Sequence, residues 1–464
     1  MIKIPAELKE LKSIFERYNK KLYIVGGYVR DSYLGISSAL RDDIDLTSSV
    51  QPKELKNMLE GTKFKVRPLN EKLGVMEISG NRRFEFATFR KEVYENDSHS
   101  PTKVSFISSL DEDAKRRDFK INAIYYDLEE ETYVDPLGGI DDLKKRIITT
   151  VKVPKIVFND DPERILRLIR FACALGFSIP EEEYFYAKQN AYKIKFISKS
   201  RLRSEFEKLL TADEVYPNLL YTKDAHYRAM VLLGEFDTWK IIMPSMDDIK
   251  NSKAVDNKGE PIYDHTLNAL KNASPKIRLA VLLHDAAKVK AVEKTKKFFG
   301  SKEFIAPIVE MNLGDYGLGY PRNIVRKVIR TIEGYDFDPF CLTSTKNVKK
   351  YILNNRDVIE NVIEIKTVVK NEGKLVSRRI KSAERLRKVF NEMIKKNTPF
   401  ERADLKIKGD EIINLYPKIR TENIDTLIDK LLENTAISPE KNTRESLVKM
   451  MDKIINSNRD FYLE

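Results

Sequence analysis

The sequence predicts an α+β fold, in which an N-terminal domain built on a β-sheet precedes domains made only of helices. Short apolar segments with period-two alternation occur between residues 22 and 89 and are typical of strands. From about residue 150 this alternation fades, and amphipathic segments with few glycines continue to the end. A chain of 464 residues also exceeds what one hydrophobic core usually supports.

Composition restricts the class of protein. Hydrophobic residues make up 42% of the chain and charged residues 33%, which is typical of a folded, water-soluble protein. The sequence has no apolar run of membrane-spanning length and no signal-peptide pattern, so we expect a cytoplasmic protein without membrane attachment. Two cysteines, Cys173 and Cys341, are too few for a disulfide framework. The net charge of +12 favours a polyanionic partner, although lysine-rich sequences also arise without function.

The first 60 residues contain four segments of clear pattern. Residues 1–20 have the spacing of an amphipathic helix with large apolar side chains on one face. The apolar run 22–25 predicts a buried strand, and a turn at Gly26 and Gly27 leads into a short helix. A further short helix is predicted over 52–60, with a proline in its first turn.

Two aspartates follow on one face of a second short strand. Side chains alternate across a strand, so Asp43 and Asp45 project together while Ile44 faces the sheet. Two carboxylates on one face repel each other unless a cation lies between them. Mg²⁺ prefers such oxygen ligands and keeps positions open for substrate phosphates. The pair therefore predicts a Mg²⁺ site, and a solvated acidic patch is the simpler alternative for so short a motif.

The glycine pair predicts a phosphate-binding turn beside these aspartates. Gly26 and Gly27 lack Cβ, so the backbone can turn sharply and a ligand can approach closely. The helix that follows would direct free N–H groups toward an anion. A phosphate-binding turn next to a metal-binding pair indicates nucleotidyl transfer, and an ordinary surface turn is the alternative.

Residues 64–89 are predicted to form strands with turns at 69–70 and 80–81. Phe84 and Phe86 alternate with Glu85, which therefore projects from the other face. If its strand lies beside that of the aspartates, Glu85 completes a carboxylate cage for two metal ions. The alternative is a glutamate on an edge strand that faces water. Residues 90–106 are polar without clear periodicity and are predicted to form a loop.

Two further polar motifs favour nucleotide binding. Arg116 and Arg117 precede Asp118, and such a group could hold a triphosphate and a ribose hydroxyl, or form only a surface salt-bridge cluster. Residues 160–176 predict a helix on which Asp161 and Arg164 are neighbours. Because Asp only accepts and Arg only donates, the pair matches an amino group beside a bare ring nitrogen, the edge shared by cytosine and adenine. The alternative is a helix cap with a local ion pair.

Six motifs stand in the order found in one enzyme family. The sequence resembles the class II tRNA nucleotidyltransferases, which comprise the CCA-adding enzymes and their bacterial poly(A) polymerase relatives. The resemblance covers about the first 215 residues closely and the rest more loosely. It is carried by GGYVRD (26–31), DIDLTS (43–48), FEFATFR (84–90), RRDFKINA (116–123), DPLGG (135–139) and DDPERILRLIRFA (160–172).

The resemblance implies a head (1–148), a helical neck (149–215), a helical body (216–375) and a helical tail (376–464). It implies an enzyme that adds C, C and A to the 3′ end of tRNA from CTP and ATP with Mg²⁺. The tail would hold the acceptor stem and TΨC arm, and no protein partner is expected. The implied catalytic residues are Asp43, Asp45 and Glu85, with metal on both aspartates, and the implied nucleotide-binding residues are Gly26, Gly27, Arg30, Arg117, Asp118, Asn122, Asp161, Arg164, Arg167 and Arg170.

The sequence departs from the family pattern at several places. Asp160 stands where the family usually has glutamate, and Ser200 replaces a glutamate of the neck motif. The loop at 97–101 lacks the usual arginine-rich turn but keeps its full length, which favours retention of adenine addition. The motif LKIKGDEIINLY at 405–416 resembles a tail motif of the family.

Residues 262–288 resemble the HD phosphohydrolase domain of some relatives. His265, His284 and Asp285 could begin a metal site, but the chain has only four histidines. Relatives place another histidine where this chain has Ser301. We therefore expect a degenerate HD-like body. The alternatives to CCA addition are A-only addition, poly(A) synthesis, an HD-type hydrolase with an RNA-binding head, or an inactive RNA-binding protein.

Overall fold

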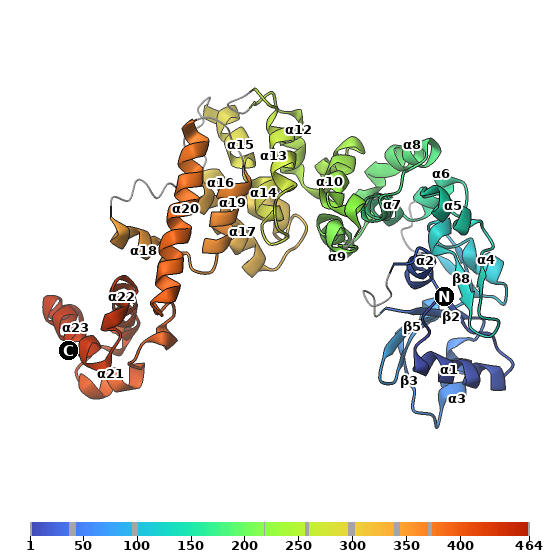
Figure 1. The fold of residues 1–464 in the computed structure, drawn as a ribbon, viewed down its shortest axis with the longest axis horizontal. Helices are drawn as coiled ribbons and strands as arrows, with labels where there is room; N and C mark the ends of the chain where they lie inside the picture. Colours follow the sequence, from blue (N-terminus) through green and yellow to red (C-terminus); the bar gives the residue numbers. More distant parts are fainter. Residues whose placement is uncertain are drawn as a thin grey trace. The chain divides into compact units, whose positions relative to one another are not determined.

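The computed structural model describes most of the chain as two compact units, Met1–Ile242 and Met243–Glu464 (Figure 1). The predicted division into four domains is finer than this and stays a prediction. The residues described are 2–36, 43–94, 101–217, 219–255, 259–295, 302–337, 344–369 and 374–462.

The first unit contains a seven-stranded mixed sheet with the order β3-β4-β5-β2-β1-β8-β9. Strands β2 and β5 run parallel, whereas the other neighbours in the sheet are antiparallel. A separate ladder pairs β6 with β7. The strands are β1 (Tyr23–Val25), β2 (Asp45–Ser48), β3 (Lys65–Asn70), β4 (Val75–Ser79), β5 (Arg83–Thr88), β6 (Arg90–Val93), β7 (Lys103–Phe106), β8 (Tyr125–Asp127) and β9 (Thr132–Val134).

Helix α1 covers part of this sheet, as its amphipathic spacing predicts. Leu8, Leu11 and Phe15 are fully buried, and the ring centroid of Phe15 lies 6.2 Å from that of Phe86 in β5. The helices of the first unit are α1 (Ala6–Arg17), α2 (Gly27–Tyr33), α3 (Pro52–Leu59), α4 (Leu110–Ala114), α5 (Gly139–Lys145), α6 (Pro154–Asp160), α7 (Glu163–Leu175), α8 (Glu181–Asn190), α9 (Lys199–Leu210), α10 (Ala225–Glu235) and α11 (Trp239–Ile242).

The loop predicted over residues 90–106 is wrong at both ends, where β6 and β7 form instead. Within β6 the inward positions hold Arg90 and Glu92, while Val93 is exposed. This strand buries an ion pair instead of apolar side chains, so the hydrophobic alternation that indicates a strand is missing. The middle of the predicted loop, including most of 97–101, lies outside the described residues.

Two smaller predictions are shifted by local geometry. The turn predicted at 69–70 forms a few residues later, as a short 3₁₀ helix over Glu71–Leu73 that ends on the left-handed Gly74. The helix predicted from residue 160 begins at Glu163, with Pro162 at the N-cap, and Oδ1 of Asp161 accepts from the Glu163 N–H at 3.1 Å. Gly176 ends the helix in the left-handed conformation, as predicted.

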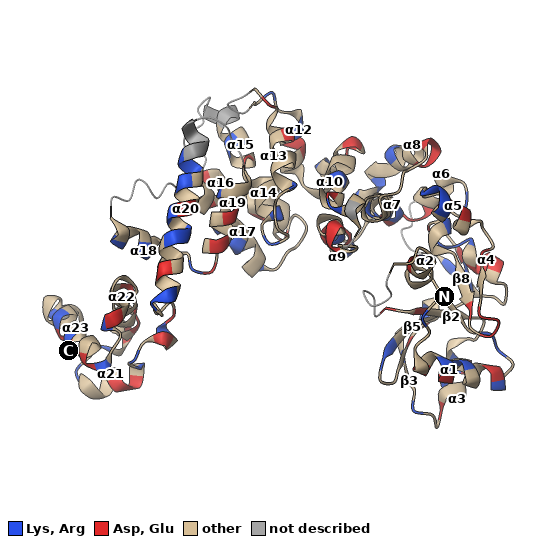
Figure 2. Cartoon of the chain, in the orientation of Figure 1, with Lys and Arg blue, Asp and Glu red and all other residues tan. Residues whose placement is uncertain are grey.

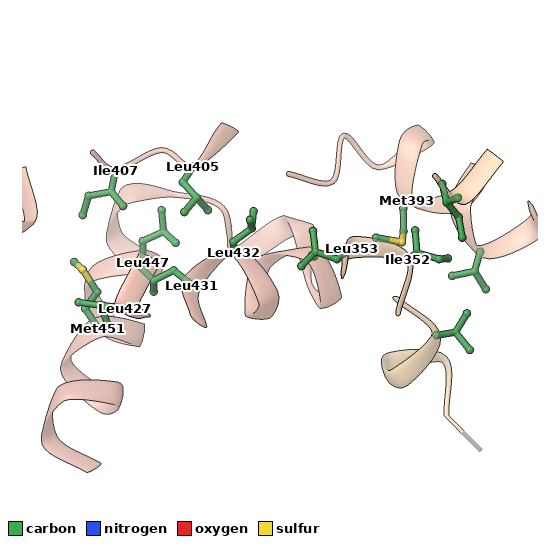
Figure 3. Packing of buried hydrophobic residues seen from close by; sticks show 14 of the residues in the cluster. Ile352, Leu353, Met393, Leu405, Ile407, Leu427, Leu431, Leu432, Leu447 and Met451 are labelled. Atoms are coloured by element: carbon green, nitrogen blue, oxygen red, sulfur yellow. The ribbon is translucent and has the colours of Figure 1, made fainter. Parts of the chain in front are cut away.

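The described residues of the second unit form helices without a strand. Buried side chains of α18, α20, α22 and α23 form one core, in which Leu427, Leu431 and Leu447 are fully buried (Figure 3). The helices are α12 (Pro244–Asn251), α13 (Ile262–Leu270), α14 (Arg278–Leu283), α15 (Ala286–Thr295), α16 (Lys302–Leu313), α17 (Arg322–Asp336), α18 (Thr345–Asn354), α19 (Ile359–Val368), α20 (Lys374–Lys395), α21 (Gly409–Leu415), α22 (Ile424–Ile437), α23 (Arg444–Ser457) and α24 (Arg459–Tyr462).

The described residues contain no candidate for a membrane-spanning helix. None of the helices there combines the length and the apolar character that crossing a bilayer requires.

Candidate active site

The predicted glycine turn lies directly beside the predicted metal pair. Gly26 has a φ of +81°, a conformation that favours glycine, and α2 begins at the next residue. A Cβ added to Gly26 would lie 3.3 Å from Oδ2 of Asp45. A phosphate bound at this turn would therefore lie within reach of any cation that the aspartates hold.

Three carboxylates converge where β2 begins beside β5. Asp43 precedes β2, Asp45 is its first residue, and Glu85 lies within β5. Asp45 is the register partner of Glu85 in the parallel pair, so the conditional prediction about neighbouring strands is confirmed. Asp43 and Asp45 are exposed while Ile44 is buried, as the alternation predicts. Burial, followed by repulsion from Asp45 and Asp43, raises the pKa of the Glu85 carboxyl. A set of hard oxygen donors that repel one another fits a divalent cation.

These carboxylates line a cleft of about 1150 Å³ in the first unit. Every catalytic and nucleotide-binding residue predicted from the sequence contributes to its lining. The cleft also carries many arginines, and a lining with both acidic and basic groups suits a nucleotide with its metal ions. The arginines that line it are Arg30, Arg83, Arg90, Arg116, Arg117, Arg164, Arg167, Arg170 and Arg201.

A buried chain of hydrogen bonds links four of the predicted residues. Arg30 is fully buried and donates from Nη1 to Oδ1 of Asn122 at 2.7 Å. Asn122 donates from Nδ2 to Oδ1 of Asp118 at 3.1 Å. Oδ2 of Asp118 accepts from Nε and Nη2 of Arg167 at 2.8 and 2.6 Å. Through Arg30, which lies in the last turn of α2, these hydrogen bonds connect α2 to the face of α7 that lines the cleft.

A residue far away in sequence completes this chain. Tyr216, 185 residues after Asp31, donates its hydroxyl to that carboxylate and accepts from Nη2 of Arg30 at 2.8 Å. Tyr216 is 2% exposed, so these partners are shielded from water. Tyr216 thereby connects the segment after α9 to α2, the helix that follows the glycine turn.

Asp118 carries a testable pH dependence. Burial opposes its charge, but Arg167 outweighs this and lowers the pKa of Asp118 to about 2. The stability that its charge contributes is therefore present above its unfolded pKa of about 3.9 and is lost as pH falls toward 2. We expect Asp118→Asn to lower the free energy of unfolding at pH 7. The difference between the two proteins should shrink below about pH 4 and vanish near pH 2. Urea unfolding at several pH values measures this, and a pH-independent difference would contradict it.

Arg117 is held in place by a second buried carboxylate. Its Nη2 lies 3.2 Å from Oδ2 of Asp113, and its Nε donates to the hydroxyl of Tyr125 at 3.1 Å. Arg116 donates from Nε to Oδ1 of the same aspartate at 2.7 Å. Asp113 is fully buried and ionised, because both arginines outweigh the cost of burial and lower its pKa. The arginine pair is thus oriented before any ligand arrives.

The predicted base-reading pair flanks the start of α7. Arg164 is the second residue of this helix, whereas Asp161 precedes it in an extended conformation, so the prediction that both lie on one helix is wrong. Arg164 is 8% exposed and donates from Nη2 to the backbone oxygen of Arg116 at 2.8 Å. Oδ2 of Asp161 lies 3.4 Å from Nη2 of Arg201, which also pairs closely with Glu163. Both Asp161 and Arg164 line the cleft. Both oxygens of Asp161 already have a partner, so a ligand would use the remaining lone pairs of this carboxylate.

The sequence did not predict several residues of this site, because these residues contact the predicted side chains and not the expected position of the ligand. The ring of Phe171 lies under three guanidinium groups, at 4.3 Å from Arg170, 5.2 Å from Arg30 and 5.3 Å from Arg167. Arg170 also donates to Oε2 of Glu205 at 2.8 Å. Only the arginine spacing in α7 gave a signal that such partners must exist, because buried guanidinium groups require them. The other missed residues are Tyr216, Arg201, Glu92 and Tyr94.

The HD-like residues meet in a separate cluster of the second unit. His265, His284 and Asp285 are all buried, and one potential ligand atom from each lies within 4.8 Å of the others. Nδ1 of His284 lies 2.6 Å from the backbone oxygen of Val281. Lys288 donates to Oδ1 of Asp285 at 2.7 Å and so places a positive charge beside the carboxylate. Ser301 lies outside the described residues, and the degenerate HD-like interpretation stays a prediction.

Comparisons with known proteins agree on one family. Residues 22–149 match the family model described as the poly(A) polymerase head domain. The CCA-adding enzyme of Streptococcus gordonii is 32% identical over 312 residues, which cover 66% of this chain and 72% of that protein. The CCA-adding enzyme of Streptococcus sanguinis is 33% identical over 305 residues, which cover 65% and 70%.

A solved structure shows a similar fold over almost the whole chain. The CCA-adding enzyme of Bacillus stearothermophilus, in complex with CTP, superposes with a TM-score of 0.63 at 21% sequence identity. The superposition covers 98% of this chain and 100% of that chain. At this level of identity the similarity concerns the α+β fold, with a mixed-sheet head followed by helices.

Proposed function

The chain belongs to the family of CCA-adding enzymes, and from that membership and its cleft we propose how it acts. It is a nucleotidyltransferase that adds C, C and A to the 3′ end of tRNA from CTP and ATP. We propose that the enzyme acts in the cytoplasm. One observation supports the assignment of the site above all. The site residues taken from the family's motifs are spread over residues 26–170, and all of them line one cleft.

The chemistry begins at the carboxylates. The family uses divalent metal ions, and we propose Mg²⁺, held by Asp43 and Asp45 with Glu85 beside them. Such ions stabilise charge on the attacking and leaving oxygens when the 3′ hydroxyl attacks the α-phosphate and pyrophosphate leaves. The glycine turn at Gly26 and Gly27 would face the triphosphate, and Arg117 would neutralise part of its charge. Because these groups are already oriented, little reorganisation accompanies the reaction.

The base is selected by hydrogen-bond complementarity. Asp161 accepts from the exocyclic amino group of cytosine or adenine, while Arg164 donates to the adjacent ring nitrogen. Uracil and guanine present a carbonyl and an N–H at these positions, which leaves buried groups without partners. Such a mismatch costs about 1–3 kcal/mol for each unsatisfied group. One pair of side chains therefore serves both substrates without a nucleic-acid template.

Nucleotide incorporation into three tRNA transcripts tests the function. The transcripts end at the discriminator base, after the first C, and after the second C. With CTP and ATP present we expect the missing residues of CCA to be added and the reaction to stop. ATP incorporation only after the second C would indicate an A-adding enzyme, long adenine tails a poly(A) polymerase, and no incorporation with Mg²⁺ would contradict the proposal.

The second unit carries the charge expected of a tRNA-binding surface. Residues 243–464 hold 42 Lys and Arg against 32 Asp and Glu, so most of the net charge lies there. The sequence of α20 has eight Lys and Arg against two Glu. Figure 2 shows basic residues predominating along the described part of this helix. We propose that this helix contacts tRNA phosphates, because phosphate contacts need charge and not sequence. Contact by the motif at 405–416 stays a prediction.

Reversing charge on α20 is expected to weaken tRNA binding. Lys381 and Lys388 are exposed and lie two turns apart on one side of this helix. Replacing both by glutamate should raise the Kd for tRNA about tenfold or more and lower its salt dependence by about one unit for each lysine. The matched control is Lys9→Glu with Lys53→Glu, on exposed positions of the head. Equal Kd values for the two double variants would contradict contact by α20.

A further inference from the structure

We infer that Tyr94 determines nucleotide selectivity by holding the Arg164 guanidinium in its base-reading position. The inference rests on the proposed role of Arg164 and adds a positioning residue to it. Tyr94 follows β6, in the segment that the sequence predicts to be a loop. It is distant in sequence from α7, and no family motif discussed above contains it.

The geometry places this tyrosine against the base-reading arginine. Cζ of Arg164 lies 5.9 Å from the centroid of the Tyr94 ring, within the distance of a cation–π contact. Both side chains line the nucleotide cleft. Nη2 of Arg164 also donates to the Arg116 backbone oxygen, at 2.8 Å. The ring and this oxygen are thus two separate supports for the guanidinium.

The Tyr94 side chain is itself held by a hydrogen bond to Glu92. Its hydroxyl donates to Oε2 of Glu92 at 2.7 Å, and Oε1 of Glu92 accepts from Nε of Arg90 at 2.7 Å. The Glu92 side chain is only 6% exposed, and Nη1 of Arg116 lies 3.7 Å from it. Burial, followed by the charge of Glu92, raises the pKa of Tyr94, so the phenol keeps the proton that it donates.

Both supports of Arg164 therefore belong to one assembly. Glu92 contacts Tyr94 and Arg116, and these two residues contact Arg164 from different segments of the chain. An arginine side chain has many rotamers, and base reading requires its donors to stay within a narrow range of directions. Without the ring, we expect the guanidinium to retain one anchor and to lose the orientation that distinguishes a bare ring nitrogen from an N–H.

A different role for Tyr94 predicts a different result. If its ring stacked on the incoming base, its loss would weaken all four nucleotides alike, since every base has a π-face. If Tyr94 positions Arg164, its loss lowers kcat/KM for CTP and ATP, whose ring nitrogens accept from Arg164. The values for UTP and GTP change little, because these bases offer no such acceptor. The ratio between correct and incorrect nucleotides separates the two roles.

The experiment compares Tyr94→Leu, Tyr94→Phe and the control Tyr133→Leu in the full-length enzyme. Tyr133 in β9 packs edge-on against Tyr33 at 5.4 Å and is not part of the cleft lining. The value of kcat/KM is measured for CTP and UTP on a tRNA ending at the discriminator base, and for ATP and GTP on one ending in CC. Thermal melts confirm that each variant is folded.

We expect Tyr94→Leu to lower kcat/KM for CTP and ATP about 10- to 100-fold while UTP and GTP change little. Tyr94→Phe keeps the ring and should restore most of the selectivity, and Tyr133→Leu should leave the ratio unchanged. An equal loss for all four nucleotides, or a Phe variant as unselective as the Leu variant, would overturn the inference. The variant Arg164→Ala tests the proposed function separately. If this variant keeps full selectivity, base reading by Arg164 is refuted, whereas a failure of the Tyr94 variants alone refutes only the positioning role of Tyr94.

Discussion

Replacing Asp45 by asparagine is expected to lower the rate of CTP and ATP incorporation about 10³-fold or more, because the substitution removes a charge that we propose to hold the metal ions. Asp45 lies opposite Glu85 in the sheet register, and its Oδ2 lies 3.3 Å from the position of a Cβ on Gly26. It therefore adjoins both the third acidic residue and the glycine turn that we propose to bind phosphate. Labelled-nucleotide incorporation at saturating Mg²⁺ measures the effect.

The same substitution should not destabilise the protein. Glu85 has a raised pKa partly because of Asp45, so the neutral amide relieves repulsion between the carboxylates. We expect the melting temperature without metal to stay equal or rise, and the increase that Mg²⁺ causes in the wild type to shrink. Asp141→Asn, at an exposed position of α5, is the matched control. Retained activity in Asp45→Asn would exclude the carboxylate cage as the catalytic centre.

Replacing Asp161 by alanine is expected to reduce the discrimination between correct and incorrect nucleotides. Asp161 is the acceptor of the proposed base-reading pair, and its removal deletes the partner of the amino group that marks cytosine and adenine. The ratio of kcat/KM for CTP over UTP should fall about 10- to 100-fold, mainly through slower CTP incorporation. Competition between CTP and UTP on a tRNA ending at the discriminator base measures this ratio directly.

The neighbouring aspartate provides a control for charge and location. Asp160 precedes Asp161, and it ends α6 outside the cleft lining. Asp160→Ala removes one negative charge within one residue of the site but should leave the CTP-to-UTP ratio unchanged. If both variants lost selectivity equally, the effect would come from the local charge or from the start of α7, and the argument from base edges would be refuted.

The sequence by itself was sufficient for the local part of this site. Alternation at 43–45 determined which carboxylates share a face. Arg167 and Arg170 of α7 were assigned to the site only by the family resemblance. The glycine of the turn and the glycine that ends α7 have the backbone conformations that their positions suggest. These features depend on neighbours in the chain, so periodicity and residue type are enough to predict them.

Only the tertiary structure decided how the charges are neutralised. The partners of Arg30, Asp118 and Arg164 include residues between 48 and 186 positions away in the chain. These contacts between distant segments follow no periodicity in the sequence. The hairpin strand β6 was predicted to be a loop for the same reason, since Glu92 buries charge where apolar side chains were expected. A buried ion pair leaves no hydrophobic pattern, because what stabilises it is one partner from another segment and not the residues beside it.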